Sequence, residues 1–360
     1  MKGEERMNKK RLAAWILALC LAGSMVSCQK QSGKTKYSAY YFDYFDTVTT
    51  VVGYADSKDE FDRVCESITA QMEEYHRLYT IYNRYAGLNN LHTVNDVDDG
   101  AHTVVQVDAK IMDLLLYGKE ICTLTGGKTN IAMGSVLSIW HEYREAGMYD
   151  PAGAQLPPMD ALRAAAEHTD ITQMILDTEN NTVFLADPEM RLDVGAVAKG
   201  YAVEMVAQQL AAEGIGGYIL NVGGNVRAIG SANGDPWSVG IENPDTEDTE
   251  TPYIAYLHLS DAAVVTSGSY QRYYMVDGKN YHHIIDPETL MPGEKYLAVS
   301  VLCKDSALGD ALSTALFLMD FEEGLALVES TPDVEAMWTL PGGEQKYSSG
   351  FAAYTFTLEK

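Results

Sequence analysis

Hydrophobic and polar positions along this chain follow two different periods. In some segments apolar side chains recur every three to four positions, which predicts helices with one buried face. Gly214 follows one such segment directly, and a glycine at that position is typical of a helix end. The helices predicted in this way cover residues 60–82, 111–123, 161–168, 197–212 and 310–319.

Other segments are short runs of β-branched and aromatic residues, which predict strands. Asp277-Gly278 separates two of these runs and is a strong hairpin signal. Two more strands are expected on either side of the turn at 179–181, and one around Trp338. The remaining predicted strands are 40–52, 103–107, 191–194, 218–222, 226–229, 273–276, 281–285, 296–303 and 351–358. Because strands and helices mix without a regular βαβ order or an internal repeat, the predicted fold class is α+β.

The N-terminus has the pattern of a targeting segment. Basic residues precede an apolar run over 12–26, which is too short to span a bilayer comfortably. The run ends in Ser27-Cys28, which resembles the lipobox of bacterial lipoproteins. We therefore expect a signal peptide over 1–27 and a lipid-bearing Cys28 that begins a short polar tether, 28–36. The protein would then be extracytoplasmic and anchored to the bacterial cell membrane, unless the segment is an uncleaved signal anchor.

The amino-acid composition indicates a folded protein and bears on which partners it can bind. The chain has 360 residues, of which 46% are hydrophobic, and this is enough for a core of ordinary size. Its 26 Lys and Arg against 51 Asp and Glu give a net charge of −25, so nucleic acid is not expected as a partner. Beyond Cys20 and Cys28, the cysteines at 65, 122 and 303 are too widely separated for a disulfide framework or a zinc site.

The sharpest local motif runs from Asp193 to Gly200, where a predicted strand meets a helix through Gly195-Ala196. The backbone N–H groups of a helix N-terminus can bind a phosphate, and Lys199 would add a full positive charge there. The motif is neither a Walker P-loop nor GxGxxG. A tight turn followed by a Lys that reaches solvent remains an alternative.

A second motif contains Asp310 and Thr314. These two residues are four apart, so on a helix a carboxylate and a hydroxyl lie on one face. Two hard oxygen ligands suit Mg²⁺, which completes its coordination with water and substrate phosphate. The alternative is a hydrogen bond from Thr314 to Asp310.

A third motif, Tyr281 to Pro287, places His283 near a strand end before Asp-Pro. A histidine titrates near neutral pH, so His283 is a candidate general base, and the alternative is a structural residue, which a single histidine without context favours. The glycine-containing segments 221–225 and 266–270 offer backbone donors and small hydroxyls, and each could also be an ordinary turn.

Taken together and in this order, these motifs resemble the FAD:protein FMN transferases, the ApbE-like lipoproteins. The similarity begins at Tyr44-Phe45-Asp46, continues through 82–85 and 130–137 to Trp140, and includes every motif above. It implies one large ApbE-like (T-fold-like) catalytic domain over 37–360. It also implies an Mg²⁺-dependent enzyme that transfers FMN from FAD to a Thr or Ser hydroxyl of a target protein and releases AMP. The acceptors implied are membrane redox subunits or extracytoplasmic flavoproteins.

The resemblance also assigns roles to residues. It makes Asp310, Thr314 and the carbonyl of Ala196 the metal ligands, and His283 the base for the acceptor hydroxyl. Lys199 would face the flavin phosphates, and Asp193 would help to order the site. The residues expected to line the FAD pocket are Asn90, Ala196, Lys199, Gly224, Ser267, Gly268 and His283.

Two positions depart from the family pattern. Leu290 stands where the family usually has glycine, and residues 87–90 replace a usual Ser-Glu pattern near Asn90. Two other functions stay open at this point. The same groups could direct water at FAD, which would give an Mg²⁺-dependent pyrophosphatase that forms FMN and AMP, or the chain could be a lipoprotein that binds FAD without cleaving it.

Overall fold

The computed structural model describes residues 33–97 and 100–356. The predictions for the signal peptide and for Cys28 therefore lie outside the described residues. The first strand already begins at Thr35, inside the segment predicted as a tether. Among the helices described, none is long and apolar enough to cross a membrane.

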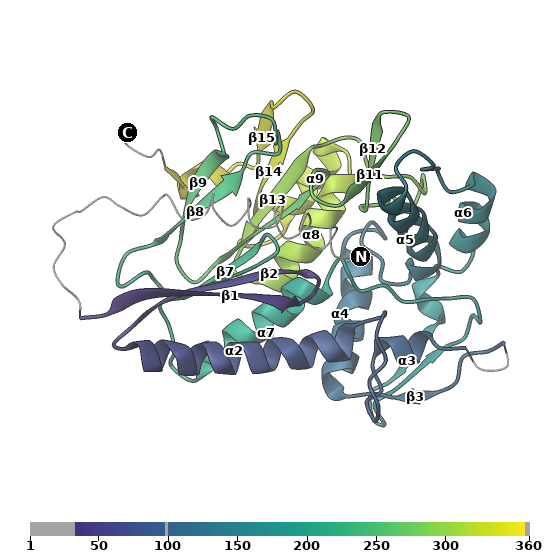
Figure 1. The fold of residues 1–360 in the computed structure, drawn as a ribbon, viewed down its shortest axis with the longest axis horizontal. Helices are drawn as coiled ribbons and strands as arrows, with labels where there is room; N and C mark the ends of the chain where they lie inside the picture. The colour runs from purple at the N-terminus through teal and green to yellow at the C-terminus, as the bar shows by residue number, and fades with distance from the viewer. Residues whose placement is uncertain (1–32, 98–99, 357–360) are drawn as a thin grey trace. The chain divides into compact units, whose positions relative to one another are not determined.

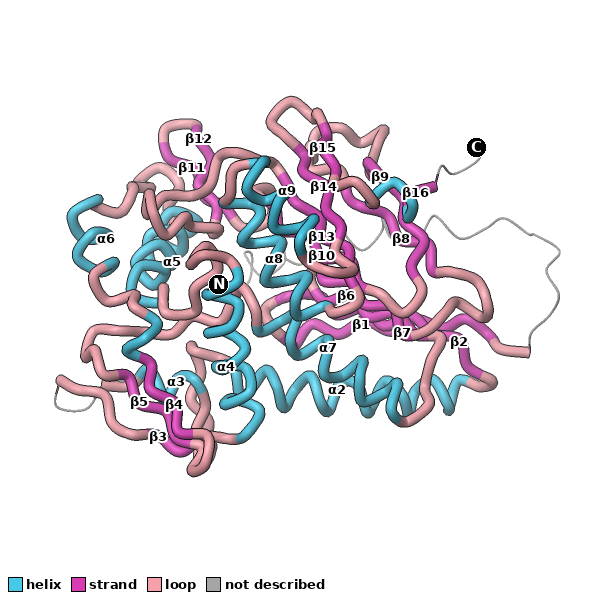
Figure 2. Tube along the Cα trace, turned by 180° about the vertical axis from the view of Figure 1, so that it is seen from behind, coloured by secondary structure: helices cyan, strands magenta, loops and turns pink. Residues whose placement is uncertain are grey.

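The centre of the fold is a mostly buried antiparallel sheet. In the described part of the chain it has eight strands, in the order β1-β2-β6-β7-β10-β13-β14-β15 (Figure 1 and Figure 2). All six residues of β13 are buried, so both faces of this part of the sheet are covered. The strands are β1 (Thr35–Tyr44), β2 (Thr47–Ala55), β6 (Tyr218–Val222), β7 (Asn225–Ile229), β10 (Ala263–Gly268), β13 (Ala298–Cys303), β14 (Glu335–Thr339) and β15 (Gln345–Tyr347).

Helices cover one face of this sheet. Helix α2 packs on β1 and β2, α7 on β6 and β7, and α8 on β10 and β13. Figure 2 shows α8 beside α7, in agreement with their many close approaches. The helices are α2 (Lys58–Tyr79), α3 (Leu91–Asn95), α4 (Ala109–Leu124), α5 (Gly134–Tyr149), α6 (Met159–Ala166), α7 (Ala198–Ala212), α8 (Ser306–Leu318) and α9 (Phe321–Ser330), with short 3₁₀ turns η1 (Ile171–Gln173) and η2 (Phe351–Tyr354).

The opposite face is covered by a small sheet, β16-β9-β8, and by η2. Trp237, Leu259 and Phe351 from these elements pack on Val264 and Leu302 of the large sheet. Two further small sheets lie outside this core, β3-β5-β4 and the ribbon β11-β12. The strands of these three small sheets are β3 (Val105–Gln106), β4 (Met174–Asp177), β5 (Thr182–Leu185), β8 (Trp237–Glu242), β9 (Tyr253–Leu259), β11 (Tyr273–Val276), β12 (Lys279–His282) and β16 (Thr355–Phe356).

The predicted helices and the hairpin are confirmed. In α2 the residues with helical spacing, from Phe61 to Tyr79, are the buried ones, and Ser57 caps the helix by accepting from the N–H of Glu60. Helix α7 ends as Gly214 predicts, with a φ of 76° at this glycine. Asp277 and Gly278 join β11 to β12 with φ values of 50° and 78°. The fold class α+β is confirmed as well.

Several strand predictions are wrong in detail. Residues 40–52 are not one strand, because Phe45 and Asp46 adopt φ values of 52° and 51° and turn the chain between β1 and β2. The run 191–194 contains only a bridge from Arg191 to Met133. Residues 351–354 form the turn η2 rather than a strand. Thr266 to Gly268, considered as a turn, are the end of strand β10.

Candidate active site

The two strongest sequence motifs meet where α7 and α8 lie side by side. Nζ of Lys199, in the first turn of α7, lies 2.7 Å from Oδ1 of Asp310 on α8. The N–H of Gly200 donates to the other carboxylate oxygen of Asp310 at 2.7 Å. Asp310 is only 5% exposed, so its charge is compensated inside the protein by these two donors.

Gly200 permits this meeting because the two helices touch there through their backbones. A Cβ on Gly200 would lie 2.4 Å from Cβ of Asp310 and 2.5 Å from the carbonyl oxygen of Ser306. Neither neighbour is the end of a flexible side chain, so a larger residue would push α7 and α8 apart. The glycine of the motif is thus required by packing, and the proximity of Lys199 and Asp310 depends on it.

A row of hydroxyl groups continues from Asp310 along α8. Ser267, on strand β10, lies 2.8 Å from Oγ of Ser313 and 3.4 Å from Oγ1 of Thr314. Thr314 therefore contacts Ser267, and the Asp310 carboxylate is engaged by Lys199 and Gly200 instead. Gly224, with φ of 86°, lies at the turn after β6, and its carbonyl accepts from the N–H of Thr266 at 3.4 Å.

His283 is held in the form that can act as a base. Its Nδ1 lies 3.3 Å from the carbonyl oxygen of Arg272, which can only accept, so Nδ1 carries the proton and Nε2 keeps a free lone pair. Burial, followed by the positive charges of Arg272 and other nearby cations, lowers the pKa of His283 to about 3. The imidazole is therefore neutral at physiological pH.

Asp193 and His283 are both influenced by one cation, Arg144. Burial raises the pKa of Asp193, while the N–H of Gly195, His141 and Arg144 oppose this rise. Oδ1 of Asp193 accepts from that N–H at 2.9 Å, which shapes the turn before α7. The charge of Arg144 lowers the pKa values of both Asp193 and His283, so the two side chains lie near the same cation.

Arg144, His141 and Tyr82 also contribute to this region, and none of them was predicted as a site residue. Arg144 donates to Nδ1 of His141 at 2.8 Å, and the ring of His141 lies 5.2 Å from that of Tyr82. Tyr82 is 55% exposed, so a planar aromatic surface is accessible beside Asp193. Only the motif at 82–85 signalled this residue in the sequence.

The loop after His283 is tied to α8 through the segment 128–129. Nζ of Lys128 lies 3.3 Å from Oδ1 of Asp286, and Lys128 is nearly buried. The hydroxyl of Thr129 donates to the carbonyl of Ala311 on α8 at 2.9 Å. The base and the Lys199-Asp310 pair are thus held by neighbouring residues of a single segment.

Three further predicted site residues are not part of the contact between Lys199 and Asp310. Ala196 is half-buried in the turn before α7, and Gly268 ends strand β10 directly after Ser267. Asn90 is fully buried and caps α3, while its amide donates to the carbonyls of Arg77 and Asn83. Its observed role is to hold the Tyr82-Asn83 segment. That these three residues line an FAD pocket stays a prediction.

The donor set at α8 fits Mg²⁺. No group of three or more His, Cys, Asp or Glu side chains that could hold a metal occurs among the described residues. The atoms available are oxygens: the buried carboxylate of Asp310, the hydroxyl of Thr314, and Oδ1 of Asn225, which is buried without a hydrogen-bond partner in the described part of the chain. Hard oxygen ligands in small number, with room for phosphate, are what Mg²⁺ accepts.

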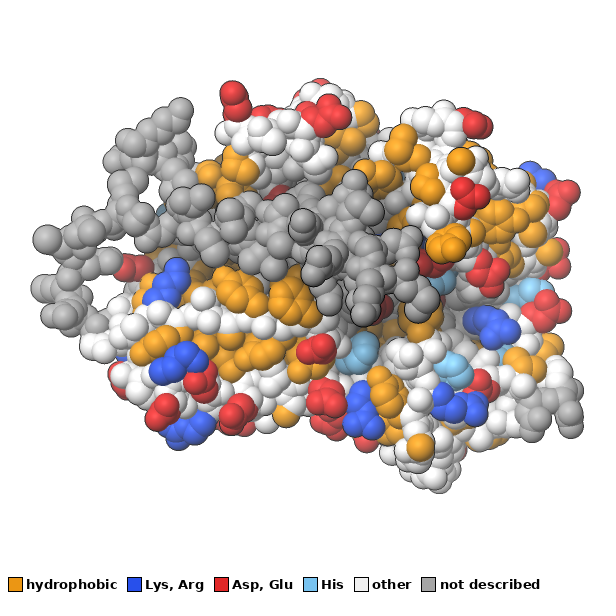
Figure 3. Space-filling view, viewed as in Figure 1, with side chains coloured by type: hydrophobic (Ala, Val, Ile, Leu, Met, Phe, Trp, Pro, Cys, Tyr) orange, Lys and Arg blue, Asp and Glu red, His pale blue; other side chains and the backbone are white. Residues whose placement is uncertain are grey.

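The negative charge of the protein means that a phosphate-bearing ligand would need a positive charge at its binding site. Figure 3 shows acidic side chains spread over the face in view rather than gathered in one patch. With a net charge of −25, a phosphate-bearing ligand is repelled at long range. Lys199 and a bound divalent ion would overcome this repulsion at one place.

Leu290 occupies a backbone conformation that suits glycine. Its φ is 61°, yet it is only 6% exposed and packs in the cluster with Trp140 and Ile285. Its carbonyl also accepts from Nε1 of Trp140 at 2.9 Å. The chain therefore keeps the turn after His283 with a leucine, and apolar contacts offset a left-handed strain of about 1–2 kcal/mol.

This balance predicts an unusual order of stability at residue 290. Leu290→Ala should lose the apolar contacts and keep the strain, at about 2–5 kcal/mol. Leu290→Gly loses the same contacts but relieves the strain, so it should be more stable than the alanine variant by about 1 kcal/mol. Urea unfolding of both variants tests this. An alanine variant more stable than the glycine variant, as in ordinary helix positions, would contradict it.

The comparisons with known proteins show the family of the chain. Residues 45–338 match the ApbE family. A protein of Treponema pallidum, named FAD:protein FMN transferase, is 32% identical over 68% of this chain and 70% of its own length. One of the same name from Vibrio cholerae is 29% identical over 94% of this chain and 98% of its own.

Solved structures show the same fold. The ApbE protein of Thermotoga maritima superposes with a TM-score of 0.77 and 26% identity, covering 90% of this chain and 100% of its own. The flavin transferase ApbE of Vibrio cholerae gives a TM-score of 0.71 with 23% identity, covering 89% and 99%.

Proposed function

Because the chain belongs to the ApbE family, we propose that it transfers the FMN half of FAD to a Thr or Ser hydroxyl of a target protein and releases AMP. The observation that carries the proposal is the Lys199-Asp310 pair, in which a buried carboxylate and a cation meet at 2.7 Å. His283, neutral and with Nε2 free, supplies the base that such a transfer requires.

The reaction balances with these groups. The acceptor oxygen forms a bond to the phosphorus of the FMN half, and the bond from that phosphorus to the bridging oxygen of the pyrophosphate breaks. AMP leaves with that oxygen, and Nε2 of His283 takes the proton of the acceptor hydroxyl. Lys199 faces the pyrophosphate and offsets its charge.

Mg²⁺ is part of this proposal. Asp310, Thr314 and the carbonyl of Ala196 would hold it, with Oδ1 of Asn225 as a further candidate ligand, since all of them supply hard oxygen atoms. When bound, the ion stabilises the negative charge that develops on the phosphate oxygens during transfer. Gly224, Ser267, Gly268 and Asn90 are proposed to line or support the FAD pocket, and Asp193 to order it.

A pyrophosphatase is the second candidate. The side chain of His283 keeps some solvent exposure, which favours a reaction in which water approaches the base. Water in place of the acceptor hydroxyl would give free FMN and AMP. A protein that binds FAD without cleaving it is disfavoured, since binding alone requires neither the base nor the buried Asp310.

The test is incubation of residues 29–360 with FAD, Mg²⁺ and an acceptor protein that contains an exposed Thr. Flavin fluorescence should remain on the acceptor after denaturation, and EDTA should abolish it. FMN and AMP formed equally without acceptor would favour the pyrophosphatase. Intact FAD with each of several acceptors would contradict both enzymatic proposals.

We also propose that the protein acts outside the cytoplasm on a lipid anchor at Cys28. The basic and apolar segment before Ser27-Cys28 supports this. Membrane redox subunits and extracytoplasmic flavoproteins are the acceptors that such a location suits. In cells grown with an alkyne-labelled fatty acid, the parental chain should carry the label and the Cys28→Ala variant should not, and an unlabelled parental chain would contradict the anchor.

A further inference from the structure

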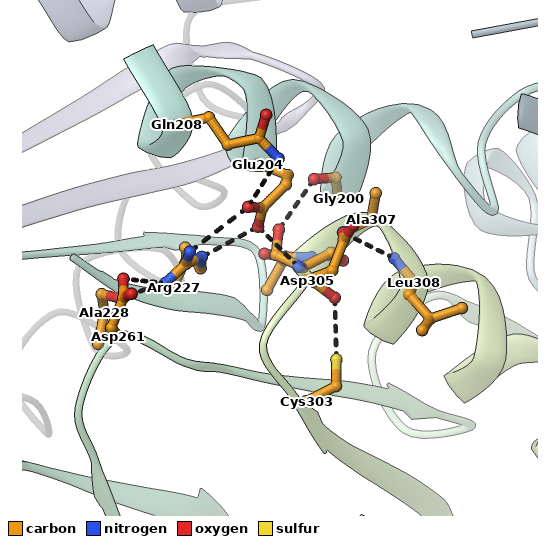
Figure 4. Close-up of polar contacts among 12 residues, drawn as sticks. Gly200, Glu204, Gln208, Arg227, Ala228, Asp261, Cys303, Asp305, Ala307 and Leu308 are labelled. Carbon is orange, nitrogen blue, oxygen red and sulfur yellow. Dashed lines mark hydrogen bonds and ion pairs between the residues drawn. The ribbon is translucent and has the colours of Figure 1, made fainter. Parts of the chain in front are cut away.

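A buried ionic network lies one helical turn from the site, and the proposed function does not use it (Figure 4). Glu204 on α7 is 3% exposed and Arg227 on β7 is 7% exposed. Nε of Arg227 lies 2.9 Å from Oε2 of Glu204. Burying two charges costs free energy of desolvation, and a protein with an apolar pair of similar size in their place is often as stable. Stability alone therefore does not explain this ion pair.

Glu204 reaches across to the start of α8. It follows Gly200 by four residues, so both lie on the face of α7 that meets α8. Oε2 of Glu204 accepts the N–H of Ser306, the first residue of α8, at 2.8 Å. This N–H has no partner within its own helix, and a carboxylate is favoured at a helix N-terminus.

The remaining contacts of α8 fix the same junction. The hydroxyl of Ser306 donates to the carbonyl of Gly200 at 2.8 Å, and the amide of Asn225 donates to the carbonyl of Ser306 at 3.3 Å. Asp310 lies four residues after Ser306 and receives the N–H of Gly200. The start of α8 is therefore held by α7 and β7 together, and the position of Asp310 follows from it.

We propose that Glu204 is a positioning residue, whose bond to the Ser306 N–H sets α8 against α7 so that Asp310 meets Lys199 and the proposed ion. Arg227 holds the carboxylate of Glu204 in the orientation that reaches Ser306. The inference rests on the proposed function only in taking Asp310 as an ion ligand.

The first test replaces the ion pair by an apolar pair, Glu204→Met with Arg227→Met. This double variant should fold, since no charge remains unpaired inside, but it lacks the acceptor for Ser306. Mn²⁺, used as a paramagnetic probe for the Mg²⁺ site, should bind about tenfold more weakly by EPR. The kcat for transfer should fall about 10²-fold, as expected for a misplacement near 1 Å.

Leu259→Ala is the matched control, since Leu259 is buried on the opposite face of the sheet. It should lower the melting temperature without changing Mn²⁺ affinity. A folded double variant with parental Mn²⁺ affinity would overturn the proposal. Mn²⁺ binding is measured without FAD, so it does not depend on flavin transfer. The positioning role of Glu204 can therefore be tested even if the proposed transferase activity is absent.

The second test removes the N–H itself and does not depend on the double variant folding. Ser306→Pro eliminates the donor to Glu204 at the first helical position, where proline is well tolerated. Ser306→Ala loses the hydroxyl but keeps that N–H. The proline variant should bind Mn²⁺ about tenfold more weakly than the alanine variant. Equal affinities would contradict a positioning role for Glu204.

Discussion

Asp310→Asn should lower the rate of flavin transfer by about 10³-fold or more, because it removes the one buried carboxylate of the proposed ion site. The amide oxygen of asparagine can still accept the Gly200 N–H, so the contact between α7 and α8 is retained. Lys199 loses its partner at 2.7 Å, and no negative charge remains to hold the ion. The measurement is the initial rate of acceptor flavinylation at saturating FAD.

A matched control for the loss of charge is Asp333→Asn. Asp333 pairs with Lys304 on the surface, and both side chains are mostly exposed. This substitution changes the net charge by the same amount and should leave the transfer rate unaltered. An Asp310→Asn variant that transfers flavin at the parental rate would remove Asp310 from the mechanism.

His283→Ala should lower transfer by about 10²-fold or more while FAD still binds, since the base acts on the acceptor and not on the flavin. FAD binding is followed by quenching of flavin fluorescence, and transfer by the flavin retained on the acceptor. His168→Ala is the control, since His168 pairs with Asp187 away from the site. Parental transfer by the His283 variant would contradict its role as base.

The pH dependence adds an independent check on His283. A histidine pKa lowered to about 3 keeps the ring neutral, and so able to accept a proton, as the pH falls through 6.5. The decline of kcat/KM in acid should thus lie well below the ordinary histidine pKa of about 6.5. A decline centred near that ordinary value would show that burial, together with the charges of Arg272 and Arg144, does not depress the pKa of His283 as inferred.

Local pattern predicted the helices well and the strands less well, for a physical reason. The cap at Ser57 and the apolar spacing of α2 are determined by neighbours along the chain. The turn at Phe45-Asp46 has no glycine or asparagine to mark it, so a run of aromatic and β-branched residues predicted one strand instead of two. Helix α5 was not predicted as a helix, because its first turn was recognised only as a family motif.

In the site, too, local sequence motifs predicted some residues, while contacts that depend on tertiary packing were not predicted. Lys199, His283, Asp310 and Thr314 each stood in a recognisable motif, and the structure pairs the first with the third. The contacts of Glu204 with Arg227 and Ser306 join residues 23 and 102 positions apart. Such contacts depend on how α7, α8 and β7 pack, which no local spacing reveals. Lys128 and Arg144 were missed for the same reason.

The most direct test of flavin transfer is the ratio of AMP released to flavin attached. Residues 29–360 are mixed with FAD and Mg²⁺, with and without an acceptor peptide that contains Thr, and the masses of the products are measured by mass spectrometry. The account predicts one AMP for each peptide made heavier by FMN, and no AMP without the peptide. AMP and free FMN in the absence of peptide, with no heavier peptide in its presence, would contradict it.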